Sequence, residues 1–388
     1  MPLVKTTQQL MKKHNFSAGP CILPEEVLQK ASEAVINFNN DDLSLIEISH
    51  RSKPFVDVME NARSLVLELL GLEDKGYSVL FLQGGASTQF LMTAYNLLNN
   101  KAGYLNTGTW SSKAIKEAKL FGELIEVASS QDKNFTYIPT GYEVPSDADY
   151  FHCTSNNTIF GTQMKDFPET NVPLICDMSS DIFSRQLDFS KFDLIYAGAQ
   201  KNMGPAGTTV VIIKEEILGK VDRVIPSMLD YKVHLGKDSM FNTPAVFPVY
   251  VSMLTLEWLK DLGGIPFIEK VNEKKANLLY NEIDRNPLFT GVVDTEDRSN
   301  MNGSEKLFLY YSDDCGQTWT FGRQWFHTIL TTGTQNTTYT PSSPNDYVLQ
   351  SHTIPANFKV SDFMYKIVWS NSSYSFQFTP YLPLPYAH

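Results

Sequence analysis

One lysine stands at the boundary between an apolar run and a loop rich in glycine and proline. The stretch YAGAQKNMGPAGTTVV, residues 196–211, places Lys201 after apolar residues and before Gly204, Pro205 and Gly207. A lysine in this position is either a surface residue that ends a strand or an amine held in a pocket. Because desolvation lowers the pKa of a lysine amine, an amine held in a pocket could act as a nucleophile.

Three further features follow other apolar runs and complement such an amine. Asp177 ends the run VPLICD, and a carboxylate at the end of a buried strand needs a cationic or N–H partner. The stretch GGAS, residues 84–87, opens an amphipathic segment, so its N–H groups could hold a phosphate at a helix N-terminus. Trp110 could stack on a planar ring. An amine for an aldehyde, an acid for a ring nitrogen, amides for a phosphate and a ring face are what a pyridoxal phosphate site needs.

Each of these features also has a purely structural interpretation. A glycine pair between a strand and a helix often serves only the geometry of the turn. Asp177 could be the N-cap of a following segment, Lys201 a surface residue and Trp110 a core residue. All four occur just after an apolar run, and this joint occurrence favours one common site.

The elements that would position these residues alternate between short apolar runs and amphipathic stretches. Residues 87–98 and 111–120 carry apolar residues at helical spacing, and the runs that read as strands are SVLFL, AGYLN, ELIEVAS, DYFHCTS, VPLICD, LIYAGA and TTVVIIK. This alternation predicts an α/β fold with a mostly parallel sheet flanked by helices. Ligands of such sheets bind beyond the carboxyl ends of the strands, where the four features lie.

The overall composition limits the class of protein and of partner. The chain has 388 residues and a formal net charge of −11. Nucleic acid and anionic membrane surfaces are not expected as partners, since either needs a basic patch. No apolar run is long enough to span a membrane, and residues 1–16 lack the apolar core of a secretory signal, so we expect a cytoplasmic protein. The four cysteines have no close spacing, so neither a disulfide framework nor a metal site is expected.

Residues 12–302 closely resemble the phosphoserine aminotransferase family, pyridoxal phosphate enzymes of the type I aminotransferase fold. The segments that carry the resemblance are HNFSAGPCILPEEV, EISHRSKPF, FLQGGASTQF, YLNTGTWSSKA, CDMSSDIFSRQLD, YAGAQKNMGPAG and SMFNTPAVFPVY. The resemblance implies a cofactor-binding large domain over 12–260, with the N-terminal segment contributing to a small domain that starts at 261–302. Residues 1–11 would be an N-terminal extension, and 303–388 an atypical β-rich tail.

The resemblance also implies a role for each site residue. Lys201 would bind pyridoxal 5'-phosphate covalently and then carry a proton between the amino acid and the cofactor. Asp177 would pair with the pyridine nitrogen, and Trp110 would cover the ring. The remaining cofactor contacts would come from Ala86, Ser87, Thr158 and Gln200, and from Asn242 and Thr243 across an obligate homodimer.

The substrate's acidic groups would be held by His50 and Arg51. Arginine suits this task because its planar fork meets carboxylate and phosphate with paired hydrogen bonds, although Arg51 alone could equally form a surface ion pair. The implied ping-pong reaction converts 3-phosphohydroxypyruvate and glutamate into O-phosphoserine and 2-oxoglutarate, in serine biosynthesis. Two alternatives are another class V aminotransferase, such as one acting on alanine and glyoxylate, and a non-enzymatic protein that binds glycan through its tail.

The resemblance ends at residue 302. The family continues with a Gly-His-Arg stretch and a further arginine that complete the substrate-anion pocket, whereas this chain reads GSEKLFLYYSDDCGQTWTFGRQW. SDDCGQTW resembles an Asp-box hairpin of secreted bacterial β-sandwich modules, with strands LFLYYS and TWTF around a turn at 314–316. VSDFMYKIVWS and YSFQF alternate as further strands. We therefore expect the cofactor to bind and transamination to be impaired.

Overall fold

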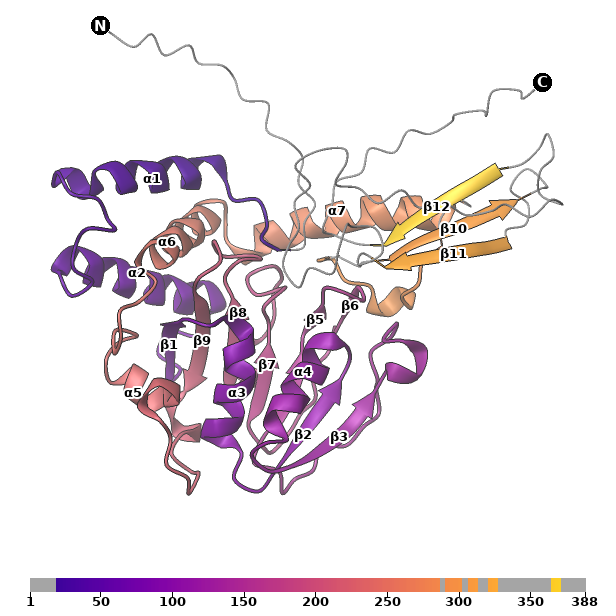
Figure 1. Cartoon of the computed structure of the whole chain (residues 1–388), viewed down its shortest axis with the longest axis horizontal. Coiled ribbons are helices and arrows are strands. Elements are labelled where there is room, and N and C mark those ends of the chain that lie inside the picture. The colour runs from indigo at the N-terminus through magenta and orange to yellow at the C-terminus, as the bar shows by residue number, and fades with distance from the viewer. Residues whose placement is uncertain (1–18, 287–289, 302–305, 313–319, 327–363, 371–388) are drawn as a thin grey trace, which may run out of the picture.

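A seven-stranded sheet forms the centre of the molecule. The computed structural model describes residues 19–286, 290–301, 306–312, 320–326 and 364–370, the last three ranges as backbone only. The strand order is β1-β9-β8-β7-β4-β2-β3 (Figure 1). The strands are β1 (Tyr77–Leu82), β2 (Lys101–Asn106), β3 (Glu123–Ser129), β4 (Phe151–Thr154), β7 (Leu174–Asp177), β8 (Leu194–Gly198) and β9 (Thr209–Lys214). Only β9 runs antiparallel to its neighbours, so the prediction of a mostly parallel sheet is confirmed.

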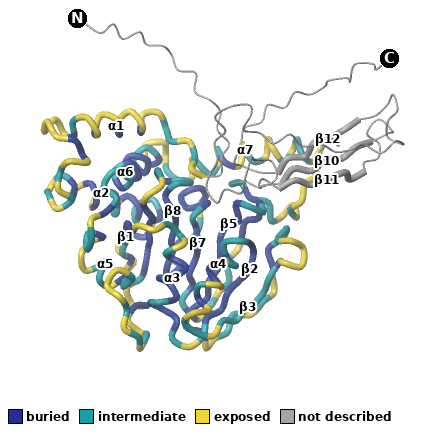
Figure 2. The backbone as a smooth tube through the Cα atoms, viewed as in Figure 1, coloured by how far each residue is buried: buried dark blue, intermediate teal, exposed yellow. Residues whose placement is uncertain are grey.

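Helices cover both faces of this sheet. One face packs against α3 (Gly85–Leu97), α4 (Thr109–Ala118) and α5 (Tyr231–Leu235), and the other against α1 (Glu25–Ile36), α2 (Lys53–Leu70) and α6 (Val246–Asp261). Side chains alternate between the faces as the pleat requires: Ile195 of β8 joins the α1–α2–α6 core, and its neighbours Leu194 and Tyr196 join the α3–α4 core. In Figure 2 the buried residues follow the strands.

The remaining elements are shorter or lie at the periphery. They are α7 (Ile265–Arg285), the two-stranded β5 (Asn156–Asn157) and β6 (Thr162–Gln163), and the 3₁₀ helices η1 (Phe38–Asn40), η2 (Gln131–Lys133), η3 (Phe189–Lys191), η4 (Glu215–Ile217), η5 (Ser227–Leu229) and η6 (Thr295–Asp297). The two helices expected at 87–98 and 111–120 are α3 and α4, and each begins two residues earlier than predicted. Among the described helices, none is long and apolar enough to cross a bilayer.

Beyond residue 302 the described backbone forms one antiparallel sheet. Its strands are β10 (Lys306–Ser312), β11 (Thr320–Phe326) and β12 (Met364–Ser370), in the order β11-β10-β12. β10 overlaps the expected strand LFLYYS, whereas β11 begins at Thr320, near the end of the expected strand TWTF, and pairs with β10 in the antiparallel direction. The expected turn at 314–316, the YSFQF strand and the residues 1–11 lie outside the described residues.

Candidate active site

Two of the predicted site residues lie on neighbouring strands. Asp177 is the last residue of β7, and Lys201 follows the end of β8. The two strands are parallel, with Asp177 in register with Tyr196. The sheet therefore brings the acid and the amine to the same carboxyl edge, as the sequence predicts.

The amine of Lys201 is held in a partly buried setting. Its Nζ donates a hydrogen bond to Thr158 Oγ1 at 2.6 Å and lies 5.9 Å from the ring centroid of Trp110. Burial lowers the pKa of Lys201 from its usual value, and the negative charges of Asp177, Cys21 and Asp181 oppose that shift. The interpretation of Lys201 as a solvated surface residue is therefore wrong, because the amine is partly desolvated and bonded.

The N-terminal segment packs directly on this lysine. A Cβ added to Gly19 would lie 3.0 Å from Cγ of Lys201, so a larger residue would require the lysine stem to shift by a few tenths of an ångström. Cys21 N donates to the backbone oxygen of Gln200 at 3.0 Å, which fixes the segment beside the loop. Burial raises the pKa of the Cys21 thiol, with Lys201 opposing. The sequence did not predict this contact. SAGPC is part of a segment that carries the family resemblance, but the resemblance gave it no role.

Asp177 is a buried carboxylate that lacks full compensation. The residue is 4% exposed, and its Oδ1 accepts a hydrogen bond from Ser179 N at 2.9 Å. Burial raises the pKa of Asp177 above its usual value, while Ser179 and Lys201 oppose the rise. Asp177 Oδ1 accepts from a backbone N–H, as an N-cap does. The residues that follow form turns and no helix, so the N-cap interpretation holds only for the hydrogen bond. A cationic ring nitrogen would supply the missing compensation.

The GGAS stretch forms an open helix N-terminus. Gly84 is the N-cap of α3 with φ 95°, and Gly85 has φ 68°, a region that favours glycine. A Cβ added to Gly85 would meet nothing within 4 Å, so there is free space at the start of the helix. Ala86 is half-buried and Ser87 exposed. The helix begins where the sequence predicts, with room beside its first amides, and their binding of a phosphate stays a prediction.

Two buried polar atoms at Trp110 and Asn157 lack partners among the residues that the structure describes. Trp110 is the second residue of α4, and its Nε1 has no hydrogen-bond acceptor. Asn157 Oδ1, next to the buried Thr158, has no donor. Buried polar groups are rarely left unpaired in proteins, so the unpaired Trp110 Nε1, on the residue whose ring lies 5.9 Å from Lys201 Nζ, fits a ligand acceptor at this place.

The other predicted residues are not gathered around Lys201. Thr243 O accepts a hydrogen bond from Gln83 Nε2 at 3.1 Å, and Asn242 Nδ2 lies 3.5 Å from Gln83 Oε1, just before the start of α3. His50 is half-buried, and burial together with Arg51 lowers its pKa. Arg51 is exposed. Within the described part of the chain, neither these residues nor the side chain of Gln200 is hydrogen-bonded to Lys201.

A second layer of polar residues behind the site was missed from sequence. Asp181 is buried, accepts from Ser155 Oγ and forms an ion pair with Arg185 at 2.9 Å. Asn202, directly after Lys201, donates to Ser180 O at 3.2 Å and to Ile182 O at 3.0 Å. The only sequence signal was the density of Ser, Asp and Asn just after the apolar runs. No group of His, Cys, Asp and Glu suited to a metal ion occurs in the described ranges.

Comparison with known proteins extends over this same part of the chain. The family model described as aminotransferase class-V matches residues 13–304. The phosphoserine aminotransferase of Flavobacterium psychrophilum is 70% identical over 296 residues, covering 76% of this chain and 83% of the relative. That of Flavobacterium johnsoniae is 71% identical over 294 residues, covering 75% and 83%. The solved structure of the PLP-bound phosphoserine aminotransferase from Trichomonas vaginalis superposes with a TM-score of 0.71 at 34% identity, covering 76% of this chain and 83% of that one.

Proposed function

The chain belongs to the class-V aminotransferase family, and we propose that it exchanges an amino group between phosphoserine and glutamate through their keto acids. The substrates would be O-phosphoserine, 3-phosphohydroxypyruvate, glutamate and 2-oxoglutarate, and the reaction would serve serine biosynthesis. The cofactor is pyridoxal 5'-phosphate. Sequence identity of 70% over most of the relative's length favours this activity over that of another class V aminotransferase or of a glycan-binding protein.

The observation that carries the proposal is the placement of Lys201. Its amine is partly desolvated, hydrogen-bonded to Thr158 and next to the Trp110 ring, at the sheet edge that also holds Asp177. A lowered lysine pKa increases the share of neutral amine, which can accept a proton. Thr158 Oγ1 orients that amine, so the proton is taken up and returned at Nζ from one direction.

The other residues would bind and orient. When bound, pyridoxal phosphate withdraws electrons from the amino-acid carbon and makes its proton removable. Asp177 would face the ring nitrogen, where its carboxylate keeps that nitrogen protonated. Trp110 would cover the ring, the Ala86 and Ser87 amides at the start of α3 would bind the phosphate, and Thr158 and Gln200 would make the remaining contacts to the cofactor's phosphate and hydroxyl.

Four predicted site residues are not hydrogen-bonded to Lys201 within the described part of one protomer. We propose a homodimer in which Asn242 and Thr243 reach the phosphate from the partner subunit, and the exposure of Thr243 supports this. His50 and Arg51 would bind the substrate's acidic groups. Residues 12–260 would form the large domain, 261–302 would begin a small domain, and the protein would act in the cytoplasm.

For residues 303–388 we propose a β-rich module of the Asp-box type. The antiparallel pairing of β10 with β11 on either side of the segment 313–319 supports a hairpin at this place. Such a module would replace the stretch that completes the substrate-anion pocket in the family. Turnover with phosphoserine would therefore be lower than that of the Flavobacterium relatives.

The test is the visible spectrum of the purified chain with added pyridoxal phosphate, followed by addition of phosphoserine. We expect a protein-bound absorption band that phosphoserine converts to that of the amino form of the cofactor, slowly if the substrate pocket is impaired. Alanine should convert it less than phosphoserine does. Conversion by alanine but not by phosphoserine would contradict the proposed substrate.

Two lysine variants serve as a matched pair for this test. Lys201→Ala should abolish the band, because no amine remains at the strand end. Lys165→Ala should leave it unchanged, although burial also lowers the pKa of Lys165, to about 8. Lys165 Nζ is hydrogen-bonded to Gln163 Oε1 and Arg298 O instead. A band that survives in Lys201→Ala would overturn the assignment.

A further inference from the structure

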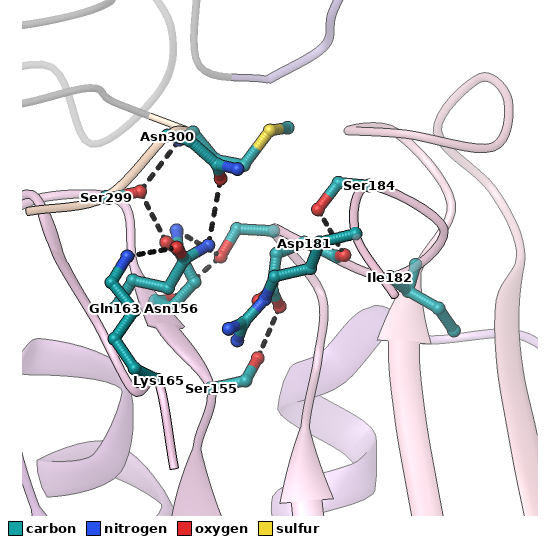
Figure 3. Close-up of polar contacts among 12 residues, drawn as sticks. Ser155, Asn156, Gln163, Lys165, Asp181, Ile182, Ser184, Ser299 and Asn300 are labelled. Carbon is teal, nitrogen blue, oxygen red and sulfur yellow. Dashed lines mark hydrogen bonds and ion pairs between the residues drawn. The ribbon is translucent and has the colours of Figure 1, made fainter. Parts of the chain in front are cut away.

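A chain of buried hydrogen bonds lies behind the candidate active site. Ser299 Oγ donates to Asn156 Oδ1, and Asn156 Nδ2 donates to Ser180 Oγ at 3.0 Å. Ser180 Oγ donates in turn to Asn156 O at 2.8 Å. Figure 3 shows Ser299 and Asn156 facing each other in this cluster. The three residues are 0%, 2% and 5% exposed, so protein groups rather than solvent satisfy these polar atoms.

The order of donors and acceptors in this chain allows one orientation of the Asn156 amide. Met301 N donates to Ser299 Oγ at 2.8 Å, which leaves the hydroxyl hydrogen of Ser299 for Asn156 Oδ1. Ser180 gives its hydroxyl hydrogen to Asn156 O, so its oxygen must accept from Asn156 Nδ2. A network in which each member is satisfied rigidifies the groups that it joins.

The chain connects the three segments that carry the central site residues. Asn156 precedes Thr158 in the β5–β6 segment, and Ser180 follows Asp177. The backbone oxygen of Ser180 accepts from Asn202, the residue directly after Lys201. Asn156 thus links the segments that carry the acid, the amine and the hydroxyl that orients the amine, and in the described residues its side chain is hydrogen-bonded to Ser180 and Ser299 and to none of those three.

We propose that Asn156 is a positioning residue, which fixes the spacing of Thr158, Asp177 and Lys201 through Ser180 and Asn202. The proposal rests on the roles proposed above for Asp177 and Lys201. Removing the amide would leave buried partners unsatisfied on two sides and let the segments shift relative to each other. Misplacement of about 1 Å at reacting groups is costly even when the change lies outside the chemistry.

Ser299 holds Asn156 from the segment that follows α7. Ser299 N donates to Gly161 O at 2.8 Å, and Tyr280 OH donates to Ser299 O at 2.7 Å. This anchor lies three residues before position 302, where the sequence departs from its relatives. Through Ser299 and Asn156, the segment that follows α7 is therefore linked by hydrogen bonds to the segments that carry the cofactor residues.

The experiment compares Asn156→Ala with Asn96→Ala. Asn96 is also 2% exposed, and its Nδ2 donates to Met92 O at 2.8 Å and to Leu229 O at 2.7 Å. It lies near the end of α3 opposite to the GGAS stretch, so its loss removes an equally buried amide away from the site. Both variants are titrated with pyridoxal phosphate, and the visible absorption of each is followed against pH.

We expect both variants to lose thermal stability, but only Asn156→Ala to alter the cofactor. Its Kd for pyridoxal phosphate should rise about tenfold, as for one buried partner left unsatisfied. The pH midpoint of its visible absorption should move upward by about half a unit, because a looser Asp177 contact makes the ring less electron-withdrawing. An unchanged Kd and midpoint, or equal changes in Asn96→Ala, would overturn the inference.

Ser299→Ala is the second variant, for the case that Asn156→Ala does not fold. It removes a single donor to Asn156 Oδ1, so the Kd should rise by roughly threefold and the midpoint should move in the same direction. A folded Ser299→Ala with wild-type values would contradict the inference. A wild-type chain without any band would defeat the proposed function itself, whereas a normal wild-type band with wild-type-like variants defeats this inference alone.

Discussion

Two consecutive helices of this chain differ sharply in what covers them. In α6 the buried residues run from Val249 to Leu259, and the helix packs against α1 and α2. The longer α7 has only Ile265 and Asn272 buried, while Leu278 is 78% exposed and Leu279 is 49% exposed. Figure 2 shows the same contrast between the interior and α7.

The difference separates the part of the molecule proposed to bind the cofactor from the part where, by resemblance, a small domain that completes the substrate pocket would continue. The sheet, α3 and the loops after β7 and β8 supply the residues proposed to bind the cofactor, and they are packed into two continuous cores. The apolar side chains of α7 imply a covering layer that, by resemblance, would be the rest of a small domain. The sequence departs from the family where that layer would continue. The apolar residues of a helix thus do not show whether another layer of the protein covers them.

Replacing the tail should produce the largest effect. A chimera that keeps residues 1–302 and continues with the C-terminal segment of the Flavobacterium johnsoniae relative would, by the family resemblance, supply the stretch that completes the substrate-anion pocket. We expect kcat/KM with phosphoserine to rise by about a thousandfold, since an unpaired buried charge commonly costs several kcal/mol. Steady-state kinetics of both proteins with phosphoserine and 2-oxoglutarate measure this.

The affinity for pyridoxal phosphate is the internal control of that experiment. It should change little between the chain and the chimera, because the cofactor residues lie before residue 302. Equal turnover of the two proteins would show that the tail supplies its own anion contacts. It would contradict the hypothesis that the substrate pocket is impaired while the cofactor site is intact.

Two leucine truncations test the packing contrast directly. Leu194→Ala in β8 removes a side chain with 0% exposure, and Leu278→Ala in α7 removes one with 78% exposure. The first should lower the free energy of unfolding by about 2–5 kcal/mol, and the second by less than about 0.5 kcal/mol. Urea unfolding without cofactor measures both. A large loss in Leu278→Ala would mean that the α7 face is covered in solution.

The sequence predicted the sheet well because its signals are local. Each apolar run in residues 78–214 became a strand, and the positions of Lys201 and Asp177 at neighbouring strand ends followed from the rule for parallel sheets. The Gly84-Gly85 pair was read correctly as the start of a helix, since glycine is favoured at positive φ.

What the sequence could not supply were contacts between distant segments. The approach of Gly19 to Lys201 and the Ser299–Asn156 hydrogen bond join residues far apart in the chain, and neither has a local pattern. The exposure of α7 was equally hidden, because its apolar residues are the same with or without a covering layer. His50, Arg51, Asn242 and Thr243 remain predictions, because in one protomer none of them is hydrogen-bonded to Lys201 in the described residues, and for Asn242 and Thr243 the proposed role would need a partner subunit.

The smallest effect concerns how the sheet region responds to acid. His152 of β4 is 1% exposed, and its Nε2 lies 2.8 Å from Tyr196 OH between the sheet's aromatic side chains. Burial lowers the pKa of His152 from its usual 6.5 to about 3. The unfolded chain therefore takes up a proton below about pH 6.5, whereas the folded protein does so only near pH 3.

Because the folded pKa is the lower one, stability from this group is complete above pH 6.5 and falls as the pH drops toward 3. The loss by pH 5 should be about 2 kcal/mol. In His152→Gln the difference in unfolding free energy between pH 7 and pH 5 should shrink by that amount, while Tyr196→Phe, which keeps the buried imidazole, should retain it. An unchanged pH dependence in His152→Gln would mean that the acid response arises elsewhere, and the exposed carboxylates of α7 would be the next groups to replace.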